Sequence, residues 1–165
     1  MSETAGPADP SLLPYRSCVG IMLINPQGLI WVGRRRDHSA WQMPQGGVNR
    51  GEEPAPAAFR ELAEETGTGK AELLAETRDW LHYDFPPHLL GNVLGGKYCG
   101  QRQKWFAMRF TGEDSDFNID APPDGQPPEF DAWRWESAER VPQLIVPFKR
   151  NVYDAVIQEF RPFLR

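Results

Sequence analysis

Acidic side chains are concentrated in one short segment of the chain. The segment reads Gly46-x5-Glu52-x7-Arg60-Glu61-Leu62-x-Glu64-Glu65-x-Gly67. On a helix that turns about 100° per residue, Glu64 lies about 60° to one side of Glu61 and Glu65 about 40° to the other, so the three carboxylates share one face. Crowded carboxylates repel one another, and a cation relieves that repulsion. Because oxygen ligands suit Mg²⁺ or Mn²⁺, the spacing predicts a divalent-metal site that holds a polyphosphate.

The acidic segment predicts a helix over Pro54–Thr66. A proline is well tolerated in the first turn of a helix, and Gly67 suits a left-handed cap at its end. The acidic residues are then expected to face away from the core. The opposite face, which we expect to pack, carries Phe59, Leu62, Ala63 and Thr66.

The spacing of the acidic segment resembles the Nudix box, the signature of hydrolases that cleave nucleoside diphosphates linked to another moiety. An isolated Glu-x-x-Glu-Glu is more typical of a solvated helix surface, but the resemblance covers the full spacing and extends from Tyr15 to Phe160. It implies an α/β Nudix fold, in which a mixed β-sheet is sandwiched between helices (α/β/α). It also implies hydrolysis by a metal-activated water, with Glu61, Glu64 and Glu65 as catalytic metal ligands.

The other fixed positions of the box have structural roles by the same resemblance. Glu52 lies nine residues before Glu61 and therefore off the acidic face, near the start of the helix. A pair between Glu52 and Arg60 would hold the preceding loop against the helix. Gly46 lets that loop approach closely, and Gly67 ends the helix.

Three motifs outside the box resemble one branch of the family, which contains RNA 5′-pyrophosphohydrolases and dinucleoside polyphosphate hydrolases. They read Trp41-Gln42-Met43-Pro44-Gln45-Gly46-Gly47, then Gly100-Gln101-Arg102-Gln103-Lys104-Trp105-Phe106, and Pro128-Glu129-Phe130-Asp131-x-Trp133-Arg134-Trp135 followed by Pro147-Phe148-Lys149-Arg150-x-x-Tyr153. The resemblance implies that Glu129 supplies a fourth catalytic carboxylate to the metal site.

Substrate contacts are expected from a second group of residues. The resemblance implies that Phe148 stacks on a base, a contact that contributes about 1–3 kcal/mol, although a core position for this side chain stays open. Lys149 and Arg150 are expected to be exposed and to meet phosphate at a helix N-terminus. The remaining candidates line a pocket or complete a positive funnel: Arg16, Arg35, Gln45, Tyr83, Arg102 and Lys104.

The composition limits what the chain can be. Its 165 residues suit one domain, which we place at residues 15–163 after a disordered arm at 1–14. The net charge of −5 argues against a general nucleic-acid coat, so an anionic substrate needs a local basic patch. Two cysteines, no long apolar segment and no signal peptide predict a cytoplasmic protein with no membrane contact. No protein partner can be identified from the sequence.

Alternating and apolar segments predict the remaining elements. We expect a hairpin of Arg16–Asn25 with Leu29–Gly33, a loop at Trp41–Gly51, and a long exposed loop at Phe117–Pro128. Further strands are expected at Glu72–Thr77, Trp80–Phe85, Lys104–Phe110 and Phe130–Trp135, and a helix at Pro147–Phe160.

Three functions are consistent with these residues. The first is removal of pyrophosphate from the 5′-triphosphate end of RNA, which leaves a 5′-monophosphate and promotes mRNA decay. The second is cleavage of dinucleoside polyphosphates such as Ap4A or Ap5A. The third is a catalytically silent module that binds nucleotide or RNA, which the complete set of glutamates disfavours.

Overall fold

The computed structural model describes residue 9, residues 12–120, residue 122 and residues 125–164. Most of the predicted N-terminal arm therefore lies outside the described residues, and the boundary at residue 15 stays a prediction. Within the described parts of the chain, no helix is both long and apolar enough to cross a membrane.

A mixed β-sheet forms the centre of the molecule. Its strands are β1 (Tyr15–Ile24), β2 (Ile30–Arg35), β3 (Trp41–Gln42), β4 (Gln45–Gly47), β5 (Ala71–Glu76), β6 (Leu81–Asp84), β7 (Gly100–Phe110) and β8 (Phe130–Glu136). The main path runs β3-β2-β1-β7-β5, while β4 pairs with β1, β6 with β7 and β8 with β2. Only β1 and β7 run parallel; every other recorded pair is antiparallel.

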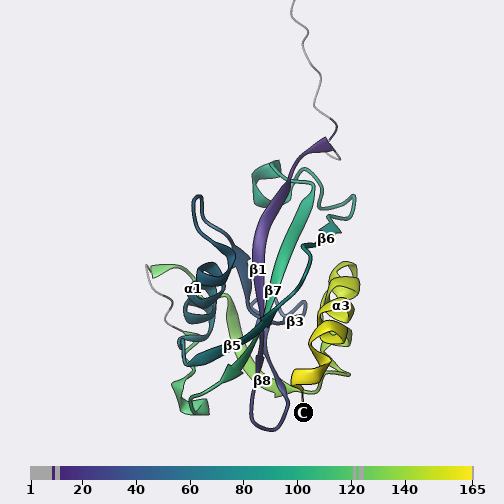
Figure 1. Ribbon diagram of the computed structural model, residues 1–165. Coiled ribbons are helices and arrows are strands. Elements are labelled where there is room, and N and C mark those ends of the chain that lie inside the picture. The colour runs from purple at the N-terminus through teal and green to yellow at the C-terminus, as the bar shows by residue number, and fades with distance from the viewer. Residues whose placement is uncertain (1–8, 10–11, 121, 123–124, 165) are drawn as a thin grey trace, which may run out of the picture.

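Helices cover both faces of this sheet. They are α1 (Pro54–Thr66), the short α2 (Val141–Leu144) and α3 (Arg150–Phe160). Figure 1 shows α1 on one side of the strands and α3 on the other. Successive side chains of β1 alternate accordingly: Ile21 and Leu23 belong to the core cluster beside α1, whereas Met22 and Ile24 belong to the cluster beside α3. The predicted α/β/α arrangement is confirmed.

Most element boundaries lie within two residues of the predicted ones, and three segments differ by more. The expected loop at Trp41–Gly51 contains two short strands, because β4 pairs with β1 despite its glycines. Strand β7 starts at Gly100, since its polar first half pairs with β1 and β6. The expected helix at Pro147–Phe160 begins with a 3₁₀ turn at Pro147–Lys149 and becomes α-helical at Arg150.

The packing face of α1 was predicted correctly only for Leu62 and Thr66. Its buried residues are Ala57, Ala58, Glu61, Leu62 and Thr66. Phe59 and Ala63 are only half-buried. The two small alanines let the helix lie close to the sheet, so the buried face overlaps the acidic face rather than opposing it. The carboxylates therefore point along the sheet towards β4, and Glu61 is only 9 % exposed.

The segment after β7 is less exposed than its composition suggested. Phe117 stacks on Phe110 with the ring centroids 4.7 Å apart. Phe117 and Ile119 also pack against the core cluster beside α1. Two apolar side chains are thus enough to fix the start of a segment that is otherwise rich in Asp, Pro and Gly.

Candidate active site

The loop before α1 is held to the helix by the pair that the sequence predicted. Arg60 donates from Nε to Glu52 Oε2 at 2.9 Å and from Nη2 to Glu52 Oε1 at 2.8 Å. Its Nη2 also donates to the carbonyl of Gly47 at 2.8 Å, and its Nη1 donates to Glu61 Oε1 at 2.8 Å. One guanidinium therefore connects the loop, strand β4 and the acidic face.

Glu52→Gln is expected to lower the free energy of unfolding by about 1–3 kcal/mol, because a half-buried network loses a charged acceptor. Hydrogen bonding from Arg60 holds the pKa of Glu52 at about 2, against an ordinary value of 4.5. The charged form thus stabilises the fold above pH 4.5, and this contribution is lost as the pH falls towards 2. Urea unfolding at several pH values measures the difference between variant and parent.

Glu53→Gln is the matched control, because Glu53 is exposed and makes no side-chain cap for α1. It should unfold like the parent. A Glu52→Gln variant as stable as the control at neutral pH would contradict the structural role of the pair.

Two glycines of the predicted box fit their expected roles. A Cβ on Gly46 would lie 2.0 Å from Cδ of Glu61, so only glycine lets β4 approach this carboxylate. Gly67 has φ of 85° and its N–H donates to the carbonyl of Ala63, which ends α1 with a left-handed cap.

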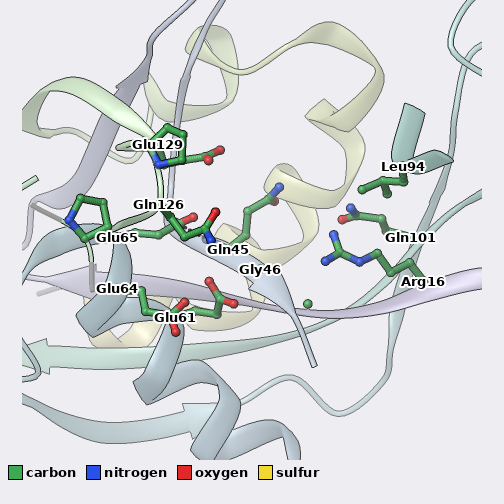
Figure 2. Close-up of a pocket in the computed structure, with 13 residues that line it drawn as sticks. Arg16, Gln45, Gly46, Glu61, Glu64, Glu65, Leu94, Gln101, Gln126 and Glu129 are labelled. Atoms are coloured by element: carbon green, nitrogen blue, oxygen red, sulfur yellow. Dashed lines mark hydrogen bonds between the residues drawn. The ribbon is translucent and has the colours of Figure 1, made fainter. Parts of the chain in front are cut away.

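An open cavity of about 530 Å³ lies beside the acidic face of α1. Its lining brings together the four predicted carboxylates, Arg16, the predicted Gln45 and Gln101 of β7 (Figure 2). The complete lining is Arg16, Gln45, Gly46, Gly47, Glu61, Glu64, Glu65, Leu94, Gln101, Pro122, Gln126, Pro127 and Glu129. Glutamates from one helix and from the segment before β8 thus converge on one space.

The carboxylates in this cavity disfavour one another's charge. Glu65 as a residue is half-buried, but burial of its carboxyl group raises the pKa well above 4.5, and the charges of Glu129 and Glu61 raise it further. Burial also raises the pKa of Glu61, although Arg60 opposes this shift. The cavity therefore favours a positive charge at its acidic wall.

The residues present fit a hard divalent cation. Among the described residues, no three His, Cys, Asp or Glu side chains are already grouped as a ligand set. Arg60 donates to Glu61 and Glu64, and Glu65 accepts the backbone N–H of Gln45 at 3.0 Å. Mg²⁺ commonly uses one or two carboxylates, with waters and substrate phosphates completing its shell. The oxygen donors and the open cavity suit that arrangement.

A second cavity of about 740 Å³ adjoins the first. The two cavities share Gln45, Leu94, Gln101 and Glu129. The second one is lined by Arg35, Asp37, Ser39, Gln45, Tyr83, Phe85, Pro86, His88, Leu89, Val93, Leu94, Gln101, Glu129, Val146, Pro147, Phe148 and Lys149. Its aromatic and aliphatic walls suit a flat, apolar group next to the polar first cavity.

Phe148 is half-buried, so it is neither a core residue nor a free surface side chain. Its ring lies 5.5 Å from the ring of Tyr83, centroid to centroid. Both rings line the second cavity, and their roles as a stacking residue and a pocket residue stay predictions.

Lys149 was expected to be exposed, and this prediction was wrong. The residue is only 7 % exposed, and its Nζ lies 5.4 Å from the centre of the Tyr83 ring. Burial, followed by the nearby charge of Arg35, lowers the pKa of Lys149 to about 8. The 3₁₀ turn at Pro147–Lys149 turns this side chain inwards, where it lines the second cavity.

Three other predicted substrate residues do not line either cavity. Arg150 is exposed and donates from Nε to the carbonyl of Pro142. Arg102 lies 4.0 Å from the ring centre of Trp80, and Lys104 donates to the carbonyl of Thr77 at 2.7 Å. Successive side chains of β7 point to opposite faces of the sheet, so Arg102 and Lys104 lie on the face opposite Gln101 and Gln103.

Several residues that line the cavities were not predicted as site residues, and Gln101 and the segment at residues 86–97 are the clearest cases. Gln101 lines both, and strand alternation next to the other amides could have indicated it. The segment at residues 86–97 lines the second cavity through four apolar residues: Pro86, Leu89, Val93 and Leu94. Nothing in its composition indicated this placement, which depends on a compact turn between β6 and β7.

Comparison with known proteins agrees with this geometry. The NUDIX domain profile matches residues 14–156. The RNA pyrophosphohydrolase of Brucella anthropi is 54 % identical over 170 residues, covering 98 % of each chain. Among solved structures, the E. coli dihydroneopterin triphosphate pyrophosphohydrolase has a TM-score of 0.66 at 19 % identity, covering 88 % of this chain and 99 % of that one.

A C. elegans Ap4A hydrolase in a binary complex has a TM-score of 0.65 at 18 % identity, covering 90 % of this chain and 97 % of that chain. At these identities the likeness between structures concerns the fold alone. The domain profile and the full-length relative, in contrast, bear on descent. Both comparisons cover the acidic helix α1, and together they show that the chain belongs to the Nudix family.

Proposed function

We propose that this protein is an RNA pyrophosphohydrolase, which removes pyrophosphate from the 5′-triphosphate end of RNA and leaves a 5′-monophosphate. The observation that carries the proposal is the junction of two unlike cavities, one acidic and one aromatic. A terminal nucleotide of RNA combines a polyphosphate with a base in the same way. The relative from Brucella anthropi, named an RNA pyrophosphohydrolase, supports the same activity.

In this proposal the metal ligands are Glu61, Glu64, Glu65 and Glu129, and the ion is Mg²⁺ or Mn²⁺. When bound, the ion neutralises phosphate charge and activates the attacking water. Arg16 lines the same cavity and contributes a fixed positive charge towards the phosphates. Because all four carboxylates line one cavity, the silent binding module is the least suitable of the three functions.

Base recognition belongs to the second cavity. Phe148 and Tyr83 provide ring faces, and Arg35 and Lys149 provide positive charge beside them. A dinucleoside polyphosphate also carries a base next to a phosphate chain, so it is the alternative substrate. With RNA as the substrate, conversion of the 5′ end would promote mRNA decay. A cytoplasmic location stays a prediction, which the two unpaired cysteines Cys18 and Cys99 support.

The direct test compares initial rates on a short triphosphorylated RNA and on Ap4A, at equal concentrations with Mg²⁺. We expect a higher kcat/KM for the RNA, together with release of pyrophosphate and a monophosphorylated 5′ end. Faster cleavage of Ap4A would favour the alternative function. Cleavage of neither substrate would favour the silent module.

Phe148→Ala is expected to weaken binding of a short triphosphorylated RNA by about 1–3 kcal/mol, because the base loses its stacking partner. Binding measured by fluorescence anisotropy in chelator-free buffer with Ca²⁺ in place of Mg²⁺ gives this value. The loss of the contact with Tyr83 makes circular dichroism a necessary control for folding. A folded variant that binds RNA like the parent would count against the stacking role.

Two single-charge variants separate the cavity from the surface. Lys149→Met removes a cation that lines the second cavity, whereas Arg150→Met removes an exposed cation that lines neither cavity. Only Lys149→Met should reduce the salt dependence of RNA binding. With one phosphate contact fewer, RNA binding releases fewer counterions. Equal effects of the two variants would place the RNA on the surface instead.

A further inference from the structure

Three hydrogen-bonded glutamines lie at the two cavities: Gln103 is buried, and Gln45 and Gln101 line both cavities. Trp105 donates from its indole N–H to Gln103 Oε1 at 2.9 Å. Trp105 is fully buried and Gln103 is 1 % exposed. An indole N–H can donate but cannot accept, so the oxygen of Gln103 must face Trp105. This contact fixes the direction of an amide whose two ends otherwise look alike.

The direction of Gln103 determines that of two further amides. Its Nε2 donates to Gln101 Oε1 at 2.9 Å and to Gln45 Oε1 at 3.2 Å. Both oxygens are therefore used as acceptors, which leaves the NH₂ groups of Gln45 and Gln101 as donors. In the part of the chain that the structure describes, neither NH₂ group donates to another protein atom.

The side chains of Gln45 and Gln101 lie at the junction of the cavities, because both residues line both cavities (Figure 2). If a polyphosphate occupies the acidic cavity and its base occupies the aromatic one, the phosphate nearest the nucleoside lies at this junction. That phosphate offers only acceptor oxygens. An amide turned the other way would place its carbonyl oxygen against them, beside the carboxylate of Glu129.

We propose that Gln103 is a positioning residue, which presents the amide N–H groups of Gln45 and Gln101 to the phosphate that joins the polyphosphate to the nucleoside. Gln103 itself has almost no accessible surface and lines neither cavity. It acts through the other two glutamines and derives its own orientation from Trp105. This role rests on the proposed function only in requiring a nucleoside polyphosphate as the substrate.

A double-mutant cycle tests whether Gln103 acts through Gln101. The variants are Gln101→Met, Gln103→Met and the double variant, assayed with triphosphorylated RNA and Mg²⁺. Gln101→Met should raise KM about 10-fold, as expected for one lost hydrogen bond to a charged acceptor. Gln103→Met should raise KM about 3-fold or more, because the freed amides no longer hold one direction. Since substrate and transition state lose the same contact, kcat should change little.

The double variant should raise KM by less than the product of the two single-variant factors. The reason is that Gln101→Met already removes the part of the Gln103→Met effect that passes through Gln101. Two KM factors that multiply fully would mean independent roles and would overturn the positioning role. The same cycle in thermal unfolding separates loss of stability from loss of orientation. A folded Gln103→Met protein with parental KM would also overturn the proposal.

Gln103→Glu provides a second variant that keeps the shape and still accepts the N–H of Trp105. Gln103 is 1 % exposed, so burial favours the protonated form of the new carboxyl group, which has one donor where the amide had two. At least one of Gln45 and Gln101 then loses its donor and can turn its oxygen towards the phosphate. This variant should raise KM above the parental value, and a parental KM would contradict the orientation argument. If the parent cleaves Ap4A but not RNA, the proposed function fails, yet the cycle with Ap4A still decides the role of Gln103.

Discussion

Glu65→Gln is expected to lower kcat by at least about 100-fold, because the loss of a metal ligand removes several kcal/mol of transition-state stabilisation. The fold should remain intact. The amide oxygen of the new side chain can still accept the backbone N–H of Gln45, as Glu65 Oε1 does at 3.0 Å. Steady-state kinetics with Mg²⁺ and triphosphorylated RNA measures the effect.

The same substitution should make the metal-free protein at least as stable as the parent at neutral pH. Burial first, and then Glu129 and Glu61, raise the pKa of Glu65 well above 4.5, so the ionised carboxyl group is disfavoured in the folded state. Its charge therefore destabilises the fold above pH 4.5, and this cost disappears at lower pH. A neutral glutamine avoids the cost throughout.

Glu53→Gln provides the control next to the same helix, since Glu53 is the exposed N-cap residue of α1 and lines neither cavity. It should keep the parental kcat and stability. If Glu65→Gln keeps near-normal turnover, the acidic cavity is not the catalytic site. If it loses activity only because it unfolds, the residue has a structural role instead.

Local spacing was sufficient to predict the helix and its acidic residues. Pro54 and Gly67 mark the ends of α1 in the sequence and in the structure. The resemblance to the Nudix box implied the pair of Glu52 and Arg60, and the structure forms it between the loop just before the helix and the helix itself. The helix ends and the Glu52–Arg60 pair depend on residues close together in the chain, so a sequence motif is enough to predict them.

The direction of a side chain depended on contacts that the motif does not contain. Lys149 looked exposed because a charged residue usually is, yet the 3₁₀ turn at Pro147–Lys149 buries it beside Tyr83. Arg102 was expected to complete a positive funnel, but the alternation of β7 puts Gln101 in the cavities instead. Which side chains of a strand face a given side of the sheet can be assigned only once the pairing register of the strand is known.

Removing divalent metal is expected to abolish hydrolysis. The four glutamates of the acidic cavity repel one another and the phosphates of a substrate. Without a cation, this repulsion prevents the polyphosphate from binding in the cavity. EDTA should reduce the rate to background, and excess Mg²⁺ or Mn²⁺ should restore it. Rates measured at a series of free Mg²⁺ concentrations give the apparent affinity.

Metal should also stabilise the folded protein, because an ion that binds only the folded state shifts the unfolding equilibrium by about 2.7 kcal/mol at 100 times its Kd. The rise in Tm with Mg²⁺ should be smaller in Glu65→Gln, which has one carboxylate fewer. Glu53→Gln should respond like the parent, since its side chain is outside the cavity. Full turnover in EDTA would contradict the metal mechanism. If turnover needs metal but Mg²⁺ does not shift the Tm, the ion binds together with the polyphosphate rather than before it.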